Sequence, residues 1–334
     1  MMGTIYINQE DAFIGKVDER IQVKAEKKTI LDVPFIKVEG LVVLGRATVS
    51  PAAIAELCQR KIPLVYLSNT GKFLGKLEAE PSKNIFLRSA QWKAAGETPQ
   101  SIHVVRGFIR GKLKNYQRSL RQAQRDRSEL NFDSAIEQIS TAIAKLDRVD
   151  NINSLRGLEG AGSAAYFRVF DRLIRVEDFT FKTRHRPATD AVNALMNFGY
   201  TLLRYDLESA IQIVGFDPYL GYLHLKHYGR VGLALDLMEE FRPLVVDSVI
   251  LNAINNGKLT RADFTVEPIS NVVRLTDEGR KTFLTLCEKK KQSEFKHPVL
   301  GRKCTYRQAY EIQARLLGKY LMGEIDKYPP LVLK

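Results

Sequence analysis

Cysteine is scarce: the 334 residues contain only Cys58, Cys287 and Cys304, which are widely spaced. Because none belongs to a Cys-x-x-Cys pair, the sequence excludes a zinc knuckle and a disulfide framework. Three free cysteines are typical of a reducing compartment, so we expect a cytoplasmic protein.

Long apolar runs are also missing, since none approaches the roughly 18 residues of a membrane-spanning helix. The first residues, Met1–Tyr6, lack the basic and then apolar pattern of a signal peptide. Two enzyme motifs are absent as well: a His-Glu-x-x-His zinc helix and a glycine-rich phosphate loop after a strand. The missing phosphate loop argues against a hydrolase that acts on a small phosphate ester.

Acidic residues are outnumbered: 51 Lys and Arg against 38 Asp and Glu leave a formal net charge of +13. Such an excess favours a polyanionic partner, either nucleic acid or an anionic membrane surface. Basic residues recur at steps of three or four along one predicted amphipathic helix: Arg106, Arg110, Lys114, Arg118, Arg121 and Arg125. This basic face is either simply solvated or a track for phosphates, and both readings stay open.

The hydrophobic pattern changes its period near residue 80 and divides the chain into two predicted domains. Residues 1–80 alternate as short strands, interrupted by one helix that Ser50 and Pro51 would begin. Residues 81–87 are the predicted linker, and residues 88–334 have helical periodicity. We therefore expect an α+β protein, in which a small mainly-β domain precedes a larger all-α catalytic domain.

Carboxylates cluster on a predicted helix that begins at Gly232 and that Pro243 should end. Asp236, Glu239 and Glu240 are spaced by three and four residues, so two or three of them share one helix face. They interrupt an otherwise apolar stretch, whereas a solvated face would contain more polar residues. From the spacing alone, either Glu239 or Glu240 could be the ligand of a metal.

Two further candidate ligands lie upstream of this helix. Glu159 is the single acid of a glycine- and alanine-rich helical segment, and small neighbours allow another helix or a ligand to come close. His224 follows a Pro/Gly turn, and His227 is its competitor. A histidine with several carboxylates is a set that suits Mg²⁺ or Mn²⁺, although the ligand types do not exclude zinc.

Together, three segments resemble the CRISPR-associated endonuclease/integrase of spacer acquisition: the Glu159 segment, the run from Asp217 to His224, and the run from Asp236 to Pro243. The segments 181–187 and 190–195 between them also resemble that family, in the expected order. Each motif is weak by itself, but several in order with compatible spacing are a strong signal. The resemblance covers most of the chain, including its N-terminal part.

The resemblance implies an activity and a set of residues. It implies a metal-dependent DNA endonuclease/integrase that inserts short DNA spacers into a CRISPR array by 3′-hydroxyl attack on a phosphodiester. It favours His224 over His227, and Glu239 over Glu240, as metal ligands. Asp236 would be either a fourth ligand or a residue that supports the other three ligands without touching the metal. The catalytic and metal-binding set is therefore Glu159, His224, Glu239 and Asp236, with Mg²⁺ or Mn²⁺ as the cofactor.

The resemblance also implies partners: double-stranded and branched DNA, a second copy of the chain in a homodimer formed through the N-terminal domain, and a small ferredoxin-like adaptation subunit. No membrane partner is implied. Basic residues that flank the acids, or lie on the basic helix, are candidate DNA contacts or ordinary surface charges: Arg184, Arg186, Lys226, Arg230, Arg110 and Lys114. A non-catalytic basic DNA-binding protein, in which the acids are structural, remains the alternative.

Overall fold

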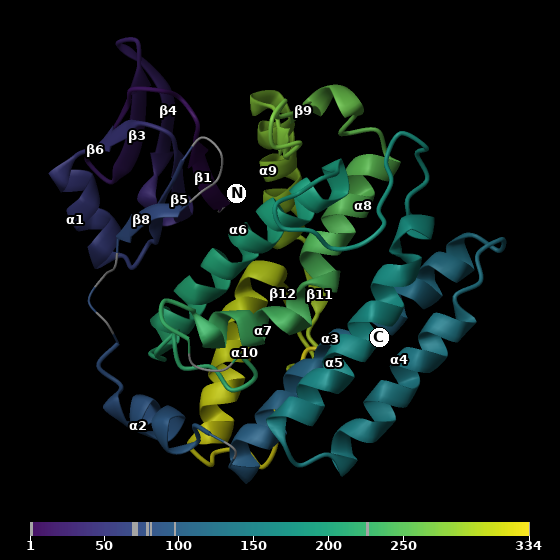
Figure 1. Cartoon of the computed structure of the whole chain (residues 1–334). Coiled ribbons are helices and arrows are strands. Elements are labelled where there is room, and N and C mark those ends of the chain that lie inside the picture. The colour runs from purple at the N-terminus through teal and green to yellow at the C-terminus, as the bar shows by residue number, and fades with distance from the viewer. Residues whose placement is uncertain are drawn as a thin grey trace. The chain divides into compact units, whose positions relative to one another are not determined.

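The chain divides into two compact units, Met1–Ser82 and Lys83–Lys334 (Figure 1). The computed structural model describes residues 3–68, 73–77, 80, 82–96, 98–224 and 227–333. The first helix of the second unit begins at Ile85, inside the segment 81–87 that was predicted as a linker. Its N-cap is Asn84, whose side chain accepts a hydrogen bond from Leu87 N at 3.1 Å.

The N-terminal unit is built from two four-stranded sheets, ordered β1-β5-β7-β8 and β4-β3-β2-β6. In the first sheet β5 pairs in parallel with β1 and β7, and β8 closes the edge antiparallel to β7. The strands are β1 (Gly3–Ile7), β2 (Ala12–Val17), β3 (Arg20–Ala25), β4 (Lys28–Pro34), β5 (Val38–Leu44), β6 (Ala47–Val49), β7 (Leu64–Leu67) and β8 (Phe73–Leu77).

The helix predicted at Ser50 and Pro51 is confirmed as α1 (Pro51–Gln59). The Ser50 side chain accepts a hydrogen bond from Ala53 N, and Pro51 occupies the first helical position. Buried residues of both sheets and of α1, such as Ile14, Leu41 and Leu57, form one apolar core. This unit therefore has its own core.

The second unit is mainly helical, with two short two-stranded sheets that the sequence did not predict, β9 with β10 and β11 with β12. Its elements are α2 (Ile85–Lys93), α3 (Pro99–Asp126), α4 (Asp133–Lys145), α5 (Ile152–Val169), α6 (Ala191–Val214), α7 (Gly232–Phe241), α8 (Ser248–Asn255), β9 (Phe264–Val266), β10 (Val273–Leu275), α9 (Asp277–Gln292), β11 (Glu294–Lys296), β12 (Lys303–Thr305) and α10 (Tyr306–Leu321), with single 3-10 turns at Leu146–Arg148, Phe170–Leu173 and Arg261–Asp263. No helix among the described residues is long and apolar enough to cross a membrane.

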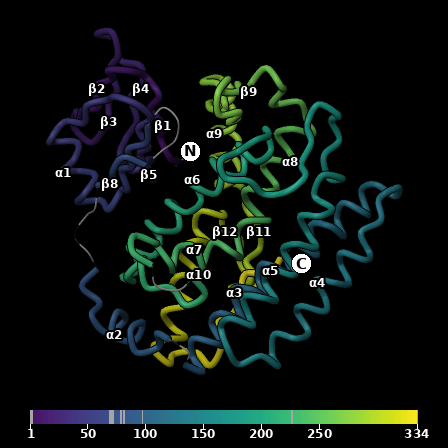
Figure 2. The backbone as a smooth tube through the Cα atoms, viewed as in Figure 1, coloured from purple at the N-terminus to yellow at the C-terminus, as the bar shows by residue number. Residues whose placement is uncertain are grey.

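The 28-residue helix α3 is central to this unit and packs against α4, α5 and α7. Figure 2 shows α4 and α5 side by side, with α3 next to α5. Helix α6 packs against α7 and α10. The three helices α3, α5 and α7 thus meet where the candidate acids lie.

Helix α7 ends at Phe241, just before Pro243, as the sequence predicted, but the chain stays helical beyond this point. Residues Pro243–Asp247 form a π-helical turn that leads directly into α8. The wider turn accommodates a residue without an N–H, and Asp247 N bonds to Arg242 O at 3.1 Å across five residues. The turn buries Asp247, which accepts a hydrogen bond from the Tyr200 hydroxyl at 2.5 Å.

Candidate active site

Helix α5 holds Glu159 against α3 because a glycine lies where the two helices meet. A Cβ added at Gly162 would lie 2.4 Å from Leu113 Cδ2, so any larger residue would force the Leu113 side chain to move. The Ser163 hydroxyl donates to Glu159 Oε1 at 2.8 Å. The predicted small-residue face therefore orients Glu159 towards the interior of the helical unit.

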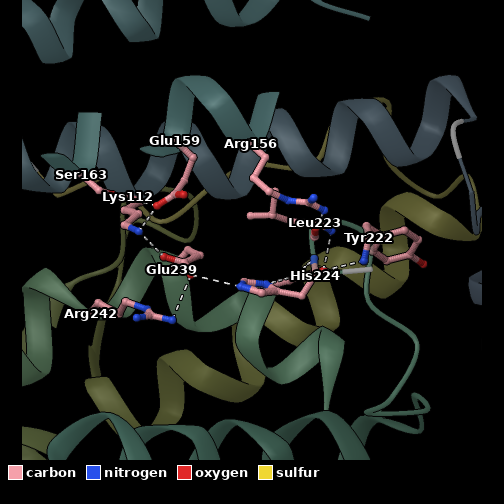
Figure 3. A network of polar contacts seen from close by, with 10 residues as sticks. Lys112, Arg156, Glu159, Ser163, Tyr222, Leu223, His224, Glu239 and Arg242 are labelled. Carbon is pink, nitrogen blue, oxygen red and sulfur yellow. Dashed lines mark hydrogen bonds and ion pairs between the residues drawn. The ribbon is translucent and has the colours of Figure 1, made fainter. Parts of the chain in front are cut away.

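A buried lysine connects the two glutamates. Lys112 of α3 donates to Glu159 Oε1, and its Nζ lies 2.7 Å from Glu239 Oε2 (Figure 3). The side chains of Lys112 and Glu239 are 5% and 3% exposed, whereas those of Glu159 and His224 are 20% and 28% exposed. The cluster therefore has a closed floor and an open side formed by Glu159 and His224.

Glu239 is surrounded by positive charge. Arg242, one turn later on α7, lies 3.1 Å from Glu239 Oε1, and His224 Nε2 lies 4.0 Å from the same oxygen. Burial alone would raise the pKa of Glu239, but the charges of Arg242, Lys112 and His224 hold that pKa below its usual value. Glu239 is accordingly an ionised carboxylate despite its burial.

Asp236 fixes the position of the histidine. Its Oδ1 accepts from His224 N at 2.8 Å and contacts His224 Nδ1 at 2.6 Å. Its Oδ2 accepts from the backbone N–H groups of Tyr222 and Leu223 at 2.5 and 2.9 Å. Burial lowers the pKa of His224, but the hydrogen bond and the charge of Asp236 outweigh it and raise that pKa overall.

Two glycines allow the histidine segment to lie on the start of α7. A Cβ at Gly221 would lie 2.5 Å from the backbone of Gly232, and a Cβ at Gly232 would lie 2.9 Å from Gly221 N. Arg156 of α5 also donates to Leu223 O at 2.8 Å. His224 is therefore positioned by α5, α7 and its own backbone, whereas the competitor His227 is exposed.

Three segments distant in the sequence thus bring Glu159, His224 and Glu239 to one place. Among the described residues, no three His, Cys, Asp or Glu side chains lie close enough to form a ready-made metal site. The donor set nevertheless fits a divalent cation: two carboxylates and an imidazole converge, and a positive charge, the Lys112 ammonium, lies between the carboxylates. Both carboxylate oxygens of Asp236 are already engaged in its four contacts with Tyr222, Leu223 and His224.

Glu240, the alternative to Glu239, faces away from this cluster. It accepts hydrogen bonds from the Tyr328 hydroxyl at 2.6 Å, Leu331 N at 2.7 Å and Gln313 Nε2 at 2.8 Å. Burial raises the pKa of Glu240 to about 7, although these hydrogen bonds lower it. Glu240 therefore ties the C-terminal segment to α7.

The candidate DNA contacts fall into different environments. Arg184 is partly buried and donates to the side chains of Asn193 and Asn197 at 2.7 and 2.9 Å, and burial lowers its pKa. Arg186 is exposed, with Nε 3.3 Å from Asn197 Oδ1. Arg184 and Arg242 both lie over the Tyr200 ring, at 5.3 and 4.9 Å from its centroid. The basic turn therefore adjoins the acid cluster.

The remaining candidates are on α3 and after His224. Arg110 pairs with Asp147 at 2.6 Å, and Lys114 is exposed on the same helix. Arg230 is exposed as well, and Lys226 lies outside the described residues. The basic face of α3 is thus partly paired within the chain.

Sequence reasoning missed Lys112, Arg242 and Asp247. Lys112 had a detectable signal: it lies one turn from Phe108 and one turn from Tyr116, so it is a lone charge on the apolar side of an amphipathic helix. Asp247 had none, because its burial depends on the π-helical turn. Tyr166, which follows Glu159 on α5, is buried and stacks on Tyr116 with ring centroids 3.8 Å apart.

Comparison with known proteins identifies the family of the chain. The family described as CRISPR associated protein Cas1 matches residues 5–289. CRISPR-associated endonuclease Cas1 3 of Thermus thermophilus is 37% identical over 336 residues, covering 100% of this chain and 98% of the relative. A solved casposase bound to an integration product has a TM-score of 0.85 at 22% identity, covering 100% of this chain and 95% of that one. A Cas6-RT-Cas1–Cas2 complex has a TM-score of 0.80 at 23% identity, covering 100% of this chain and 36% of that one.

The strand-rich unit, the helical unit and these relatives place the protein in the class of CRISPR-associated proteins, whose relatives are named endonucleases. Within that class, the chain belongs to the Cas1 family. The family match spans both units, so the N-terminal strands are part of it as well as the acid cluster.

Proposed function

We propose that Glu159, His224 and Glu239 bind a divalent cation, Mg²⁺ or Mn²⁺, and that the site both cleaves DNA and joins a DNA 3′-hydroxyl to a phosphodiester of a CRISPR array. The observation that supports this most is the convergence of the three side chains from α5, α7 and the segment before α7. When bound there, a divalent cation supplies polarisation of a phosphoryl oxygen and stabilisation of the leaving oxygen.

The residues of the chain have separate tasks in this proposal. Asp236 holds the His224 ring through Nδ1, so that Nε2 faces Glu239 and the open side of the cluster. Ser163 orients Glu159, and Arg242 keeps Glu239 ionised. Because its oxygens are already occupied, we assign Asp236 to orienting His224 rather than to direct ligation.

Phosphodiester contacts come from the basic residues beside the cluster. The exposed Arg186 and Arg230, with the Lys114 side of α3, would neutralise backbone phosphates. The nucleophile is water for cleavage and a 3′-hydroxyl for strand transfer, since the chemistry at phosphorus is the same. One site therefore serves both reactions.

The proposal includes partners. A homodimer, double-stranded and branched DNA, and a small ferredoxin-like subunit would assemble around the chain. This is supported by the likeness to a chain of the Cas6-RT-Cas1–Cas2 complex and to a casposase bound to an integration product.

Strand transfer and cleavage of short duplex and branched DNA, with the partner subunit present, test the site. We expect product with Mg²⁺ or Mn²⁺, none with EDTA, and a loss of more than about 100-fold in Glu159→Ala, His224→Ala and Glu239→Gln, because removing a ligand should exceed the 10–100-fold cost of removing an outer partner. Gel-resolved product yields give the measurement.

The matched control is Glu240→Gln, an equally buried acid whose side chain contacts the C-terminal segment instead. It should retain activity within about threefold. Full activity in all three cluster variants would refute the assignment. DNA binding that ignores EDTA and forms no product would instead favour the non-catalytic DNA-binding protein.

A further inference from the structure

A cavity with several cationic side chains in its lining lies further along α3 than the acid cluster. It has a volume of about 320 Å³ and is bounded by the C-terminal half of α3, the turn after α7, helix α8 and the last turn of α9. None of Glu159, His224 and Glu239 lines it. Pro243 and Leu244 form part of its wall, so it lies directly behind the helix that carries Glu239.

The charge of this cavity is one-sided. Four cationic side chains line it, Arg118, Arg127, Arg175 and Lys290, against a single carboxylate, Asp126. Asp126 is itself engaged, because its Oδ1 accepts from Gln122 Nε2 at 2.7 Å. The residues that line the cavity therefore carry an excess of positive charge.

Lys290 shows the consequence of this excess. Its Nζ makes a cation–π contact with Tyr306, at 4.4 Å from the centroid of the ring. Burial and, to a smaller extent, the charge of Arg118 together lower the pKa of Lys290 to about 8. An anion in the cavity would relieve both effects.

Arg127, a second cation of the lining, has an unpaired polar group. Its Nη2 donates to Arg172 O at 2.9 Å, but its Nε is buried and has no hydrogen-bond partner among the described residues. Burial and the neighbouring Arg175 lower its pKa. A buried guanidinium N–H without an acceptor is costly, so the site favours a ligand that supplies one.

The cavity is also held in shape by the chain. Asn255 of α8 accepts from Arg175 N at 2.8 Å and donates to Leu173 O at 2.9 Å. These bonds fix the backbone that carries Arg175 relative to α8. The volume is within the range of small-ligand sites, and arginine forks match the oxygens of a phosphate.

We propose that this cavity binds a phosphate group, carried by a free nucleotide or by a nucleic-acid strand, at a site separate from the acid cluster. Arg127 and Lys290 are its principal contacts, and Arg118 and Arg175 complete the positive lining. Binding here requires no divalent cation and is independent of the cleavage and strand-transfer activities.

Equilibrium binding in EDTA tests the proposal, because chelation keeps divalent cations from attaching phosphates to the acid cluster. The probes are fluorescent adenosine monophosphate and two single-stranded oligonucleotides, one with a 5′-phosphate and one with a 5′-hydroxyl. The variant is Arg127→Gln with Lys290→Gln. The control is Arg125→Gln, an exposed arginine of the same helix that lies outside the cavity and bonds to Gln122.

We expect the double variant to bind at least one probe roughly tenfold more weakly or worse, as for the loss of one charge-assisted hydrogen bond, and the control to match wild type. A loss confined to adenosine monophosphate identifies a nucleotide site, and a loss confined to the 5′-phosphorylated strand identifies a strand end. A loss shared by both oligonucleotides identifies an internal phosphate of the strand.

Thermal unfolding is a second measurement, which shows whether a loss of binding is caused by a loss of folding. Because the double variant removes mutually repelling charges, its Tm should equal or exceed that of wild type in the absence of ligand. The proposal is overturned if no probe binds at millimolar concentration, or if the double variant binds every probe as tightly as wild type.

Discussion

The two faces of α7 place consecutive glutamates in opposite environments. Glu239 is buried among cations, with Lys112 at 2.7 Å and Arg242 at 3.1 Å, and its pKa is lowered. Glu240 is equally buried, but its partners are neutral groups of the C-terminal segment, and burial raises its pKa to about 7. Neighbouring charges, and not burial, decide whether a carboxylate on this helix stays ionised at neutral pH.

This difference separates a chemical face from a structural one. An ionised carboxylate beside a histidine on an open side is available to bind a cation or a substrate group. A carboxyl group whose pKa is raised to about 7, and which has three internal partners, instead fastens the segment from Tyr328 to Leu331 onto α7 and α10. Two kinds of substitution test this difference. One removes a positive charge beside Glu239, and the other replaces the titratable carboxyl group of Glu240.

Replacing Lys112 by methionine should have the largest effect on stability. The substitution leaves Glu239 and Glu159 without their shared ammonium, so Glu239 moves towards the situation of Glu240. Removing one partner of a buried ion pair typically costs about 3–5 kcal/mol in the free energy of unfolding. Urea unfolding at pH 7 measures the loss.

The control for this change is Lys114→Met, two residues away on the same helix but exposed. It should alter the free energy of unfolding by less than about 0.5 kcal/mol. If Lys112→Met loses less than about 1 kcal/mol, the ammonium is not a main stabilising partner of Glu239, and the contrast between the two faces would have another cause.

Replacing Glu240 by glutamine should change how stability depends on pH. Because the pKa of Glu240 in the folded protein, about 7, lies above its ordinary value of 4.5, the folded state binds more protons between these pH values. This contribution is fully present below pH 4.5 and is lost as pH rises towards 7, by about 3 kcal/mol. The wild-type curve of unfolding free energy against pH should therefore fall more steeply than that of the variant.

Asp247 serves as the internal reference for that measurement. Burial raises its pKa to about 6, so it adds a slope of the same sign, but the slope is common to wild type and variant. The difference between the two curves isolates Glu240. Parallel curves between pH 4.5 and 7 would mean that Glu240 is already ionised in the folded protein.

Local signals predicted the elements that carry the site. The amphipathic period of α3, the small residues around Glu159 and the acid spacing on α7 are all properties of neighbouring residues, and each corresponds to a helix in the structure. Family resemblance selected Glu239 over Glu240, although both have helical spacing from Asp236. Their different partners are distant in the sequence and cannot be derived from spacing.

The features that sequence reasoning missed depend on tertiary contacts. Lys112 meets its carboxylates only because Gly162 lets α5 approach α3 closely. The turn at Pro243 continues as a π-helix since Asp247 N finds an acceptor five residues earlier. Local propensity correctly predicted that the α-helix ends before Pro243, but it did not predict the π-helical turn that follows.

The smallest effect concerns Lys114, the exposed counterpart of Lys112 on α3. If its face of the helix lies along DNA, Lys114→Met should weaken binding equally for all sequences and make the slope of log K against log salt less negative by about 1. Binding constants can be measured by fluorescence anisotropy between about 50 and 200 mM salt. This roughly fourfold range of salt concentration is wide enough to resolve such a change in slope. Stability should not move, because the side chain is solvated. An unchanged slope would mean that Lys114 is only solvated and does not contact DNA. Lys112 and Lys114 would then differ in burial alone.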